Sequence, residues 1–309
     1  MPSALTHYVF NEKLIKNDKY KQIFLLAGQG ADTLFFYGYN ITKRNNKKEI
    51  RQFGHDLHAI NPDKLYMEML KYAFSKTDEE KDILINFTRG FMYHYALDRH
   101  LHPYVFYNTG FPYNNKSYNL NHGNFESIMD TLLMNEYGYK NSTRSILKAP
   151  NKEIKLCSKM ISHIAKELFN IDYIEDNTYY KAYKDYRFAR LLLDSKYGVK
   201  KTIFNKFFNK SLINAISQPH KVKDDSQYDY LNKEHKEWVI PSTGEVSNSS
   251  VKDLFFKAEE DTRIVDTIIY NFKDNFVTQK KITKFTNNIN HDGRDLDKTM
   301  TYFKVIWSK

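Results

Sequence analysis

The sequence predicts an all-α fold, arranged as a single multi-helix domain over residues 1–309. Apolar residues recur at steps of three and four through most of the chain, which is the spacing of one buried helix face. Valine and isoleucine form no alternating runs typical of half-buried strands, and the sequence holds no fixed-period repeat. With 309 residues, of which 41% are hydrophobic, the chain is long enough to bury a large core.

Capping residues and helix breakers set the expected helix boundaries. Asn61 and Pro62 are typical of a helix start, and Thr77-Asp-Glu-Glu80 has the sequence of a capping box. The helix that opens there should end by Pro103, because proline lacks a backbone donor. The expected helices cover about residues 4–26 (ended by Gly28-Gln-Gly30), 62–74, 77–103, from 122 onward, 151–169, 177–196, 199–216 and 249–273, and residues 104–121 and 217–250 should be irregular.

Composition limits the class of protein. No apolar run approaches the roughly 18 residues of a membrane span, and no secretory signal precedes the first helix, so a cytoplasmic protein is expected. Cys157 is the only cysteine, which excludes an internal disulfide and a cysteine-rich zinc finger. The formal net charge of +10 suits nucleic acid, an anionic membrane or a phosphorylated substrate. The lysines are scattered, however, and most are interpreted as a solvated surface.

Two histidine–carboxylate motifs carry the chemistry. His94, Asp98 and His102 follow at steps of four, which places them on one helix face, and His122 and Glu126 repeat that step. A single such pair is most often a surface hydrogen bond. Here apolar residues surround the groups, and buried polar groups need internal partners. Imidazole and carboxylate bind zinc where thiols are absent, so the motifs predict zinc sites that share ligands.

With three shorter motifs, these two resemble the zinc-dependent phospholipase C family, in particular its bacterial intracellular members. The wider superfamily includes single-strand nucleases of the P1/S1 type. The match covers about residues 5–130 and depends chiefly on the two helical motifs, the second of which continues to Asp130. The shorter motifs are Thr6-His7, Gly28-Gln-Gly-Ala-Asp32 before an aromatic run, and Gly54-His-Asp-Leu-His58.

The resemblance implies a helical fold with up to three zinc ions at the base of a cleft. Asp98 would be the bridging ligand between the first and third ions. The implied ligands are Asp32, His58, His94 and Asp98 for the first ion, His102, His122 and Glu126 for the second, and Asp98, His7 and the backbone of the first residue for the third.

Two of these assignments have alternatives. His55 is the alternative to His58, which is favoured because its Leu-His dipeptide is closer to the family pattern. Removal of Met1 would leave the Pro2 amine five residues before His7, whereas retention of Met1 would put the third zinc site in doubt.

Other residues near the motifs have predicted roles. Asp32 is the candidate catalytic residue, which would orient or deprotonate the attacking water, and the alternative is a role as ligand only. Phe35, Phe36 and Tyr37 are candidate substrate-binding residues, because aromatic rings bind a choline headgroup, although such runs more often belong to a core. His100 points away from the His94 face and is expected to lie outside the ligand set.

The predicted function is a zinc-dependent phosphodiester hydrolase, phospholipase C-like, acting on a phospholipid or related phosphate ester with transient contact to a membrane surface. One alternative is a single-strand nuclease, which the basic charge favours weakly and which would take nucleic acid as its partner. Another is a non-catalytic helical protein that contains zinc. Seven of the eleven histidines precede residue 123, so the metal-ligand half is expected at about residues 1–135.

Overall fold

The computed structural model of the chain is mostly helical, which confirms the predicted all-α class. It describes residues 4–15, 18–40, 42–112, 117–139, 147–194, 197–208, 211–218 and 228–307. Within these ranges the only strands are β1 (Trp238–Val239) and β2 (Val246–Ser247), which pair as a short antiparallel hairpin. None of the helices in the same ranges combines the length and apolar character needed to traverse a lipid bilayer.

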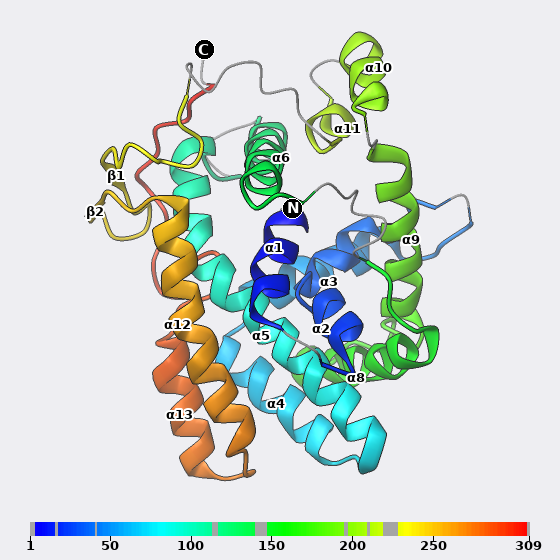
Figure 1. Cartoon of the computed structure of the whole chain (residues 1–309). Coiled ribbons are helices and arrows are strands. Elements are labelled where there is room, and N and C mark those ends of the chain that lie inside the picture. The colour runs from blue at the N-terminus through cyan, green and yellow to red at the C-terminus, as the bar shows by residue number, and fades with distance from the viewer. Residues whose placement is uncertain are drawn as a thin grey trace.

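Helix α5 (Asp78–Thr109) runs through the middle of the molecule and organises the fold (Figure 1). It buries side chains on all its faces, as expected for a helix inside a core. The helices that pack directly on it come from both halves of the sequence: α1 (Ala4–Leu14), α2 (Lys21–Ala27), α4 (Pro62–Phe74), α6 (Tyr118–Glu136), α8 (Asn151–Phe169) and α12 (Val251–Tyr270).

The other elements pack around this group. A 3₁₀ helix, η1, connects α2 to α3 and lies against α3, α5 and α9, while α11 packs on α6 and α13 packs on α4 and α12. These elements are η1 (Gly30–Phe36), α3 (Lys47–Ala59), α9 (Thr178–Leu193), α10 (Val199–Phe207), α11 (Leu212–Ala215) and α13 (Phe276–Thr286).

The single helix predicted over about residues 4–26 is wrong, because this segment forms two helices, α1 and α2. Asp18 fixes the start of the second helix. Its carboxylate accepts a hydrogen bond from Tyr20 N at 2.7 Å, and its carbonyl accepts one from Lys21 N at 3.2 Å. Aspartate favours such local bonds over a helix interior. The break lets α1 pack on α6 while α2 packs on α5.

The prediction that the central helix ends by Pro103 is also wrong, since α5 continues to Thr109. A proline inside a helix costs about 3 kcal/mol. Val105 and Phe106 are buried beyond it, and burial of such side chains contributes roughly 1.5–3 kcal/mol each. Tertiary packing therefore overrides the local signal, and the segment predicted as irregular over 104–121 is helical at both ends.

The remaining boundaries agree in part. Helices α4 and α8 have the predicted ranges, and the Asn61 side chain caps α4 by accepting a hydrogen bond from Asp63 N at 2.8 Å. Thr77 precedes α5, but its side chain makes no capping bond to the described residues, so the predicted capping box is wrong. The helix predicted over 199–216 is divided into α10 and α11, and α3 and α13 have no predicted counterpart. Of the predicted irregular segment, residues 219–227 lie outside the described ranges.

Candidate metal centre

Helix α5 presents three of the predicted ligands on one face. His94 Nε2 lies 3.0 Å from Asp98 Oδ2, and His102 Nε2 lies 3.6 Å from Asp98 Oδ1. His94 is 0% exposed and Asp98 is 2% exposed. The steps of four read from the sequence therefore place a carboxylate between two imidazoles inside the core.

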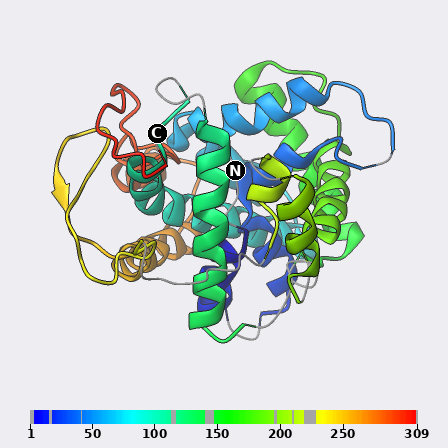
Figure 2. The ribbon, with the colours of Figure 1, turned by 90° about the horizontal axis from the view of Figure 1, so that it is seen from above.

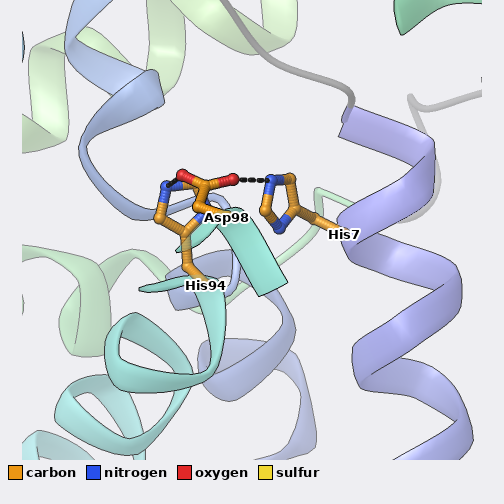
Figure 3. Close-up of side chains that lie close together, drawn as sticks. All are labelled: His7, His94 and Asp98. Carbon is orange, nitrogen blue, oxygen red and sulfur yellow. Dashed lines mark ion pairs between the residues drawn. The ribbon is translucent and has the colours of Figure 1, made fainter. Parts of the chain in front are cut away.

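Helix α1 brings His7 to the same carboxylate from another direction (Figure 3). His7 Nε2 lies 3.0 Å from Asp98 Oδ1. The start of α1 is held by Asp130 of α6, whose carboxylate accepts hydrogen bonds from Thr6 N at 2.8 Å and Thr6 Oγ1 at 2.7 Å. A carboxylate at this end of a helix is also favoured by the helix dipole. Asp130 therefore positions His7.

The side chains of Asp32 in η1 and His58 in α3 complete this side of the cluster. His58 Nε2 lies 3.2 Å from Asp32 Oδ1 and 4.0 Å from Asp98 Oδ2. The other ring nitrogen, Nδ1, donates to Gly54 O at 2.7 Å, so Nε2 is the nitrogen that faces the cluster and could bind a cation. His55 is exposed and lies against the Phe35 ring instead. Of the two histidines that the sequence left open, His58 is the one in the cluster.

A second carboxylate lies beside His102. Glu126 Oε1 on α6 is 3.1 Å from His122 Nε2, one turn earlier on the same helix, and 3.8 Å from His102 Nε2. Glu126 and His122 are both buried. Because His102 also approaches Asp98, this part of the cluster is continuous with the first.

The eight predicted metal ligands thus gather in three groups that could each hold a metal ion. Within a group, one ligand atom from each residue lies within 4.8 Å of the others. His94 belongs to two groups, so the groups are neighbours rather than separate sites. Their members are His7, His94 and Asp98; Asp32, His58 and His94; and His102, His122 and Glu126.

Several buried ligand atoms have no hydrogen-bond partner among the described residues. They are both ring nitrogens of His94, both ring nitrogens of His122, Nδ1 of His7 and Oδ2 of Asp98. An unpaired buried polar group costs about 1–3 kcal/mol, and more when it is charged. A cation at each group would give a partner to the one ring nitrogen or carboxylate oxygen that each residue turns toward it, so the residues present fit bound metal.

Electrostatics prepares some of the candidate ligands near Asp98 for metal binding, but not all of them. Although burial opposes ionisation, the surrounding imidazoles of His102, His94 and His7 hold the pKa of Asp98 well below its ordinary value. Burial lowers the pKa of His94, which keeps this imidazole neutral. Burial also disfavours the charged form of His58, but Asp32 outweighs it and raises the pKa of His58 to about 9. A cation must therefore displace a proton from His58 at neutral pH.

The Glu126 group differs. Burial raises the pKa of Glu126 to about 7, and burial lowers the pKa of His122 well below its ordinary value. At neutral pH and without metal, Glu126 is therefore about half ionised and His122 is neutral.

No model of a protein family, no curated protein and no solved structure matches the chain. The resemblance to the zinc-dependent phospholipase C family therefore stays a prediction.

Gly30 allows the close packing at the centre of the cluster. Its φ is +53°, and a side-chain carbon there would lie 2.1 Å from His94 Cδ2. Only glycine combines this backbone conformation with space for the imidazole. Of the two roles that the sequence suggests for Gly30, ending a helix and allowing a close approach of the backbone, the second is seen here against His94.

His291 is a residue of this centre that sequence reasoning missed. Its backbone carbonyl accepts a hydrogen bond from His102 Nδ1 at 2.7 Å, which directs His102 Nε2 into the cluster. Its fully buried ring lies 5.1 Å from the His58 ring, centroid to centroid, and its Nε2 lies 3.1 Å from Tyr66 Oη. The turn sequence Asn290-His-Asp-Gly293 indicates a loop, but nothing in it indicates where the loop docks. The assumption that the chemistry is confined to residues 1–135 is therefore too narrow.

The remaining predicted residues fall into different places. Phe35 stacks on the His58 ring and borders the cluster. Phe36 and Tyr37 are buried, with Phe36 against the Tyr186 ring, so they belong to the core, and a substrate contact for them stays a prediction. His100 lies outside the cluster as expected, where Nε2 lies 2.8 Å from Asp261 Oδ2. The predicted third-site ligand at the first residue lies outside the described residues.

Proposed function

We propose that this protein is a zinc-dependent phosphodiester hydrolase of the phospholipase C type. The observation that carries the proposal is the fusion of three donor groups into one buried cluster through His94, Asp98 and His102. A structural metal site needs one closed set of about four ligands. Adjacent ions that share ligands are typical of enzymes that cleave phosphate esters.

The donor set supports zinc. All side-chain donors are imidazole nitrogens or carboxylate oxygens, and Cys157 is buried away from them in the core. Zinc binds such mixed sets, and neutral imidazoles are its usual nitrogen ligands. When bound, neighbouring zinc ions polarise phosphoryl oxygens and make a water molecule acidic enough to attack near neutral pH.

The role of Asp32 follows from its surroundings. Burial opposes ionisation, yet the hydrogen bond from His58 and the nearby imidazole of His94 lower the pKa of Asp32 below its ordinary value. A carboxylate with a lowered pKa is a weak proton acceptor. Asp32 is therefore better suited to hold a cation than to deprotonate water, and we assign it first as a ligand.

The substrate class is the broader part of the proposal. A phosphodiester carries one negative charge, which suits a cluster whose bound ions exceed its carboxylates in charge. We propose a phospholipid or a related phosphate ester as the substrate. The chain's formal charge of +10 also suits nucleic acid, so cleavage of single-stranded DNA or RNA is the alternative.

The test is a metal and turnover assay on the untagged protein. We expect zinc by elemental analysis and hydrolysis of both bis(p-nitrophenyl) phosphate and phosphatidylcholine. His94→Ala should lose both zinc and hydrolysis. His163→Ala is the matched control, because His163 on α8 pairs with Glu68 at 2.8 Å outside the cluster.

Three outcomes would count against the proposal. Protein without zinc would remove its basis. Zinc without turnover of any phosphodiester would indicate a non-catalytic protein. Cleavage of single-stranded DNA or RNA without hydrolysis of phosphatidylcholine would replace the lipid substrate by nucleic acid.

A further inference from the structure

The segment around α10 exposes an unusual number of apolar side chains. Eight of the seventeen large hydrophobic side chains that are exposed among the described residues lie between positions 191 and 213. On α10, Val199, Ile203 and Phe207 are 60%, 47% and 68% exposed. They recur at steps of four and therefore form one stripe along the helix. We call this stripe, with its neighbours Leu192, Tyr197, Phe208 and Ile213, the α10 surface.

Helix α10 does not use its apolar residues to join the core. Its one buried residue is Lys201, whose amine donates a hydrogen bond to the carbonyl of Asn214 and so ties α10 to α11. Phe204 is only partly buried. A surface helix ordinarily turns its apolar stripe inward, whereas a contiguous apolar patch in water is typical of an interaction site.

The charged residues near α10 in the sequence have one sign. Residues 195–217 contain five lysines and no aspartate or glutamate, and of the described ones Lys200 and Lys206 reach the surface while Lys201 is buried. Lys206 is exposed, and its amine lies 5.5 Å from the centre of the Phe207 ring. The preceding carboxylate, Asp194, is buried and lies 2.7 Å from the Arg190 guanidinium, so it does not offset this charge.

The α10 surface is connected to the metal cluster. Helix α11 packs on α6 at Gly123, where a side-chain carbon would lie 3.0 Å from Ile216 Cγ2, and Gly123 directly follows His122. Gln218, just beyond α11, donates to Asp130 at 2.9 Å. Figure 2 shows α10 and α11 beside α6 on the face where α1 begins, and Figure 1 shows them at the same end of the molecule.

We propose that the α10 surface docks the protein on an anionic phospholipid bilayer, so that the part of α6 that carries His122 lies on the membrane side of the molecule. An amphipathic helix with phenylalanine and isoleucine on one face and lysines beside them lies in the plane of a lipid interface, and anionic headgroups attract its lysines. Nucleic acid would engage the lysines but leave the aliphatic stripe in water. The docking itself is argued from exposure and charge. It rests on the proposed function only in its benefit, which would be to bring a lipid substrate to the cluster.

The test is co-sedimentation with vesicles of phosphatidylglycerol and phosphatidylcholine, using protein with and without zinc. We expect binding in both states that weakens with added salt and with vesicles of phosphatidylcholine alone. The double variant Ile203→Ser, Phe207→Ser should bind at least about ten-fold more weakly. Both side chains are exposed, so the fold should be retained, and circular dichroism checks this.

The matched control is Phe276→Ser, since Phe276 is 78% exposed on α13, away from the α10 surface. It should bind vesicles like the original protein. Equal loss of binding in the control, or no binding to anionic vesicles, would overturn the proposal. So would self-association that the double variant abolishes, because a second copy would then be the occupant.

Failure of docking and failure of the proposed function can be told apart. If the double variant loses vesicle binding but still hydrolyses soluble bis(p-nitrophenyl) phosphate, docking is separate from the chemistry, as proposed. If the original protein hydrolyses the soluble ester but does not bind vesicles, only the docking proposal is wrong. If it binds vesicles without hydrolysing any ester, the hydrolase function is wrong and the docking surface remains.

Discussion

The two carboxylates at the middle of the cluster, Asp98 and Glu126, are equally buried but behave in opposite ways. Four imidazole nitrogens lie within 4.0 Å of Asp98, and its pKa is held well below the ordinary value. Two lie that close to Glu126, whose pKa burial raises to about 7. Burial alone favours the neutral acid, and the number of surrounding imidazoles decides whether it prevails. Asp98 is thus a permanent anion, while Glu126 is a titrating one.

The largest expected effect comes from Asp98→Asn. Asp98 contacts members of all three groups, so its loss should remove metal from the two groups around His94. Hydrolysis should fall by about 10³-fold or more. Elemental analysis and a phosphodiester assay measure both effects. Retention of the full metal content would show that Asp98 is not a shared ligand.

Glu126→Gln should have a smaller effect. It should remove the ion held with His102 and His122 and leave the others bound. Without metal, the variant should be more stable than the original protein at pH 7. The folded pKa of Glu126 is raised to about 7, above the unfolded value of about 4.5, so ionisation costs the folded state stability as the pH rises between these values. Denaturant unfolding of both metal-free proteins at pH 5 and pH 7 checks this. A stability difference between variant and original protein that is the same at both pH values would contradict it.

The two groups should also respond differently to pH. Below its pKa, each displaced proton changes metal affinity about ten-fold per pH unit. The pKa of His58 is about 9, so zinc affinity at its group should rise about 100-fold from pH 7 to pH 9. Affinity at the Glu126 group should level off above pH 7. Chelator competition measures each group in the variant that should keep it: the His58 group in Glu126→Gln and the Glu126 group in Asp98→Asn. Zinc affinities that change in parallel with pH would contradict the expected difference.

The raised pKa of His58 also affects the stability of the metal-free protein. Zinc affinity should rise with pH, whereas the stability of the metal-free protein should fall. The folded pKa of His58 lies above the unfolded value of about 6.5. The contribution of protonated His58 to stability is therefore complete below pH 6.5 and is lost as the pH rises through about 9. Thermal unfolding with a chelator present, compared with Asp32→Asn, measures this contribution. A pH-independent difference between the two proteins would contradict it.

The smallest effect is expected from His291→Ala. The backbone carbonyl that orients His102 remains, but the loop loses the buried ring that anchors it beside Tyr66. Metal affinity at the Glu126 group should fall about ten-fold, as for other residues that orient ligands. Stability should fall by about 2–4 kcal/mol. Metal titration separates the two effects: a loss of stability with unchanged affinity would mean that the ring is not needed to keep the carbonyl of residue 291 against His102.

The sequence was sufficient to predict the fold class and the candidate ligands on α5 and α6, because both depend on the helical period. Steps of four place His94, Asp98 and His102 on one face whatever the surroundings. It failed where long-range packing decides: Pro103 lies within a helix because Val105 and Phe106 are buried beyond it. His291 escaped for the same reason, since its role depends on where a distant loop docks. The exposure of α10 was equally hidden, because its apolar spacing matches that of a buried helix.

The hydrogen bonds that position the ligands have a consequence for the order in which the protein is made. His94 and Asp98 can meet as soon as one turn of α5 forms. His7 is anchored only when Asp130 becomes available, and His102 gains its acceptor only when residue 291 has been synthesised. A ribosome-bound chain therefore carries the ligands long before it can hold them in place. Complete metal loading should therefore wait until residue 291 has been synthesised and its carbonyl can accept the hydrogen bond from His102.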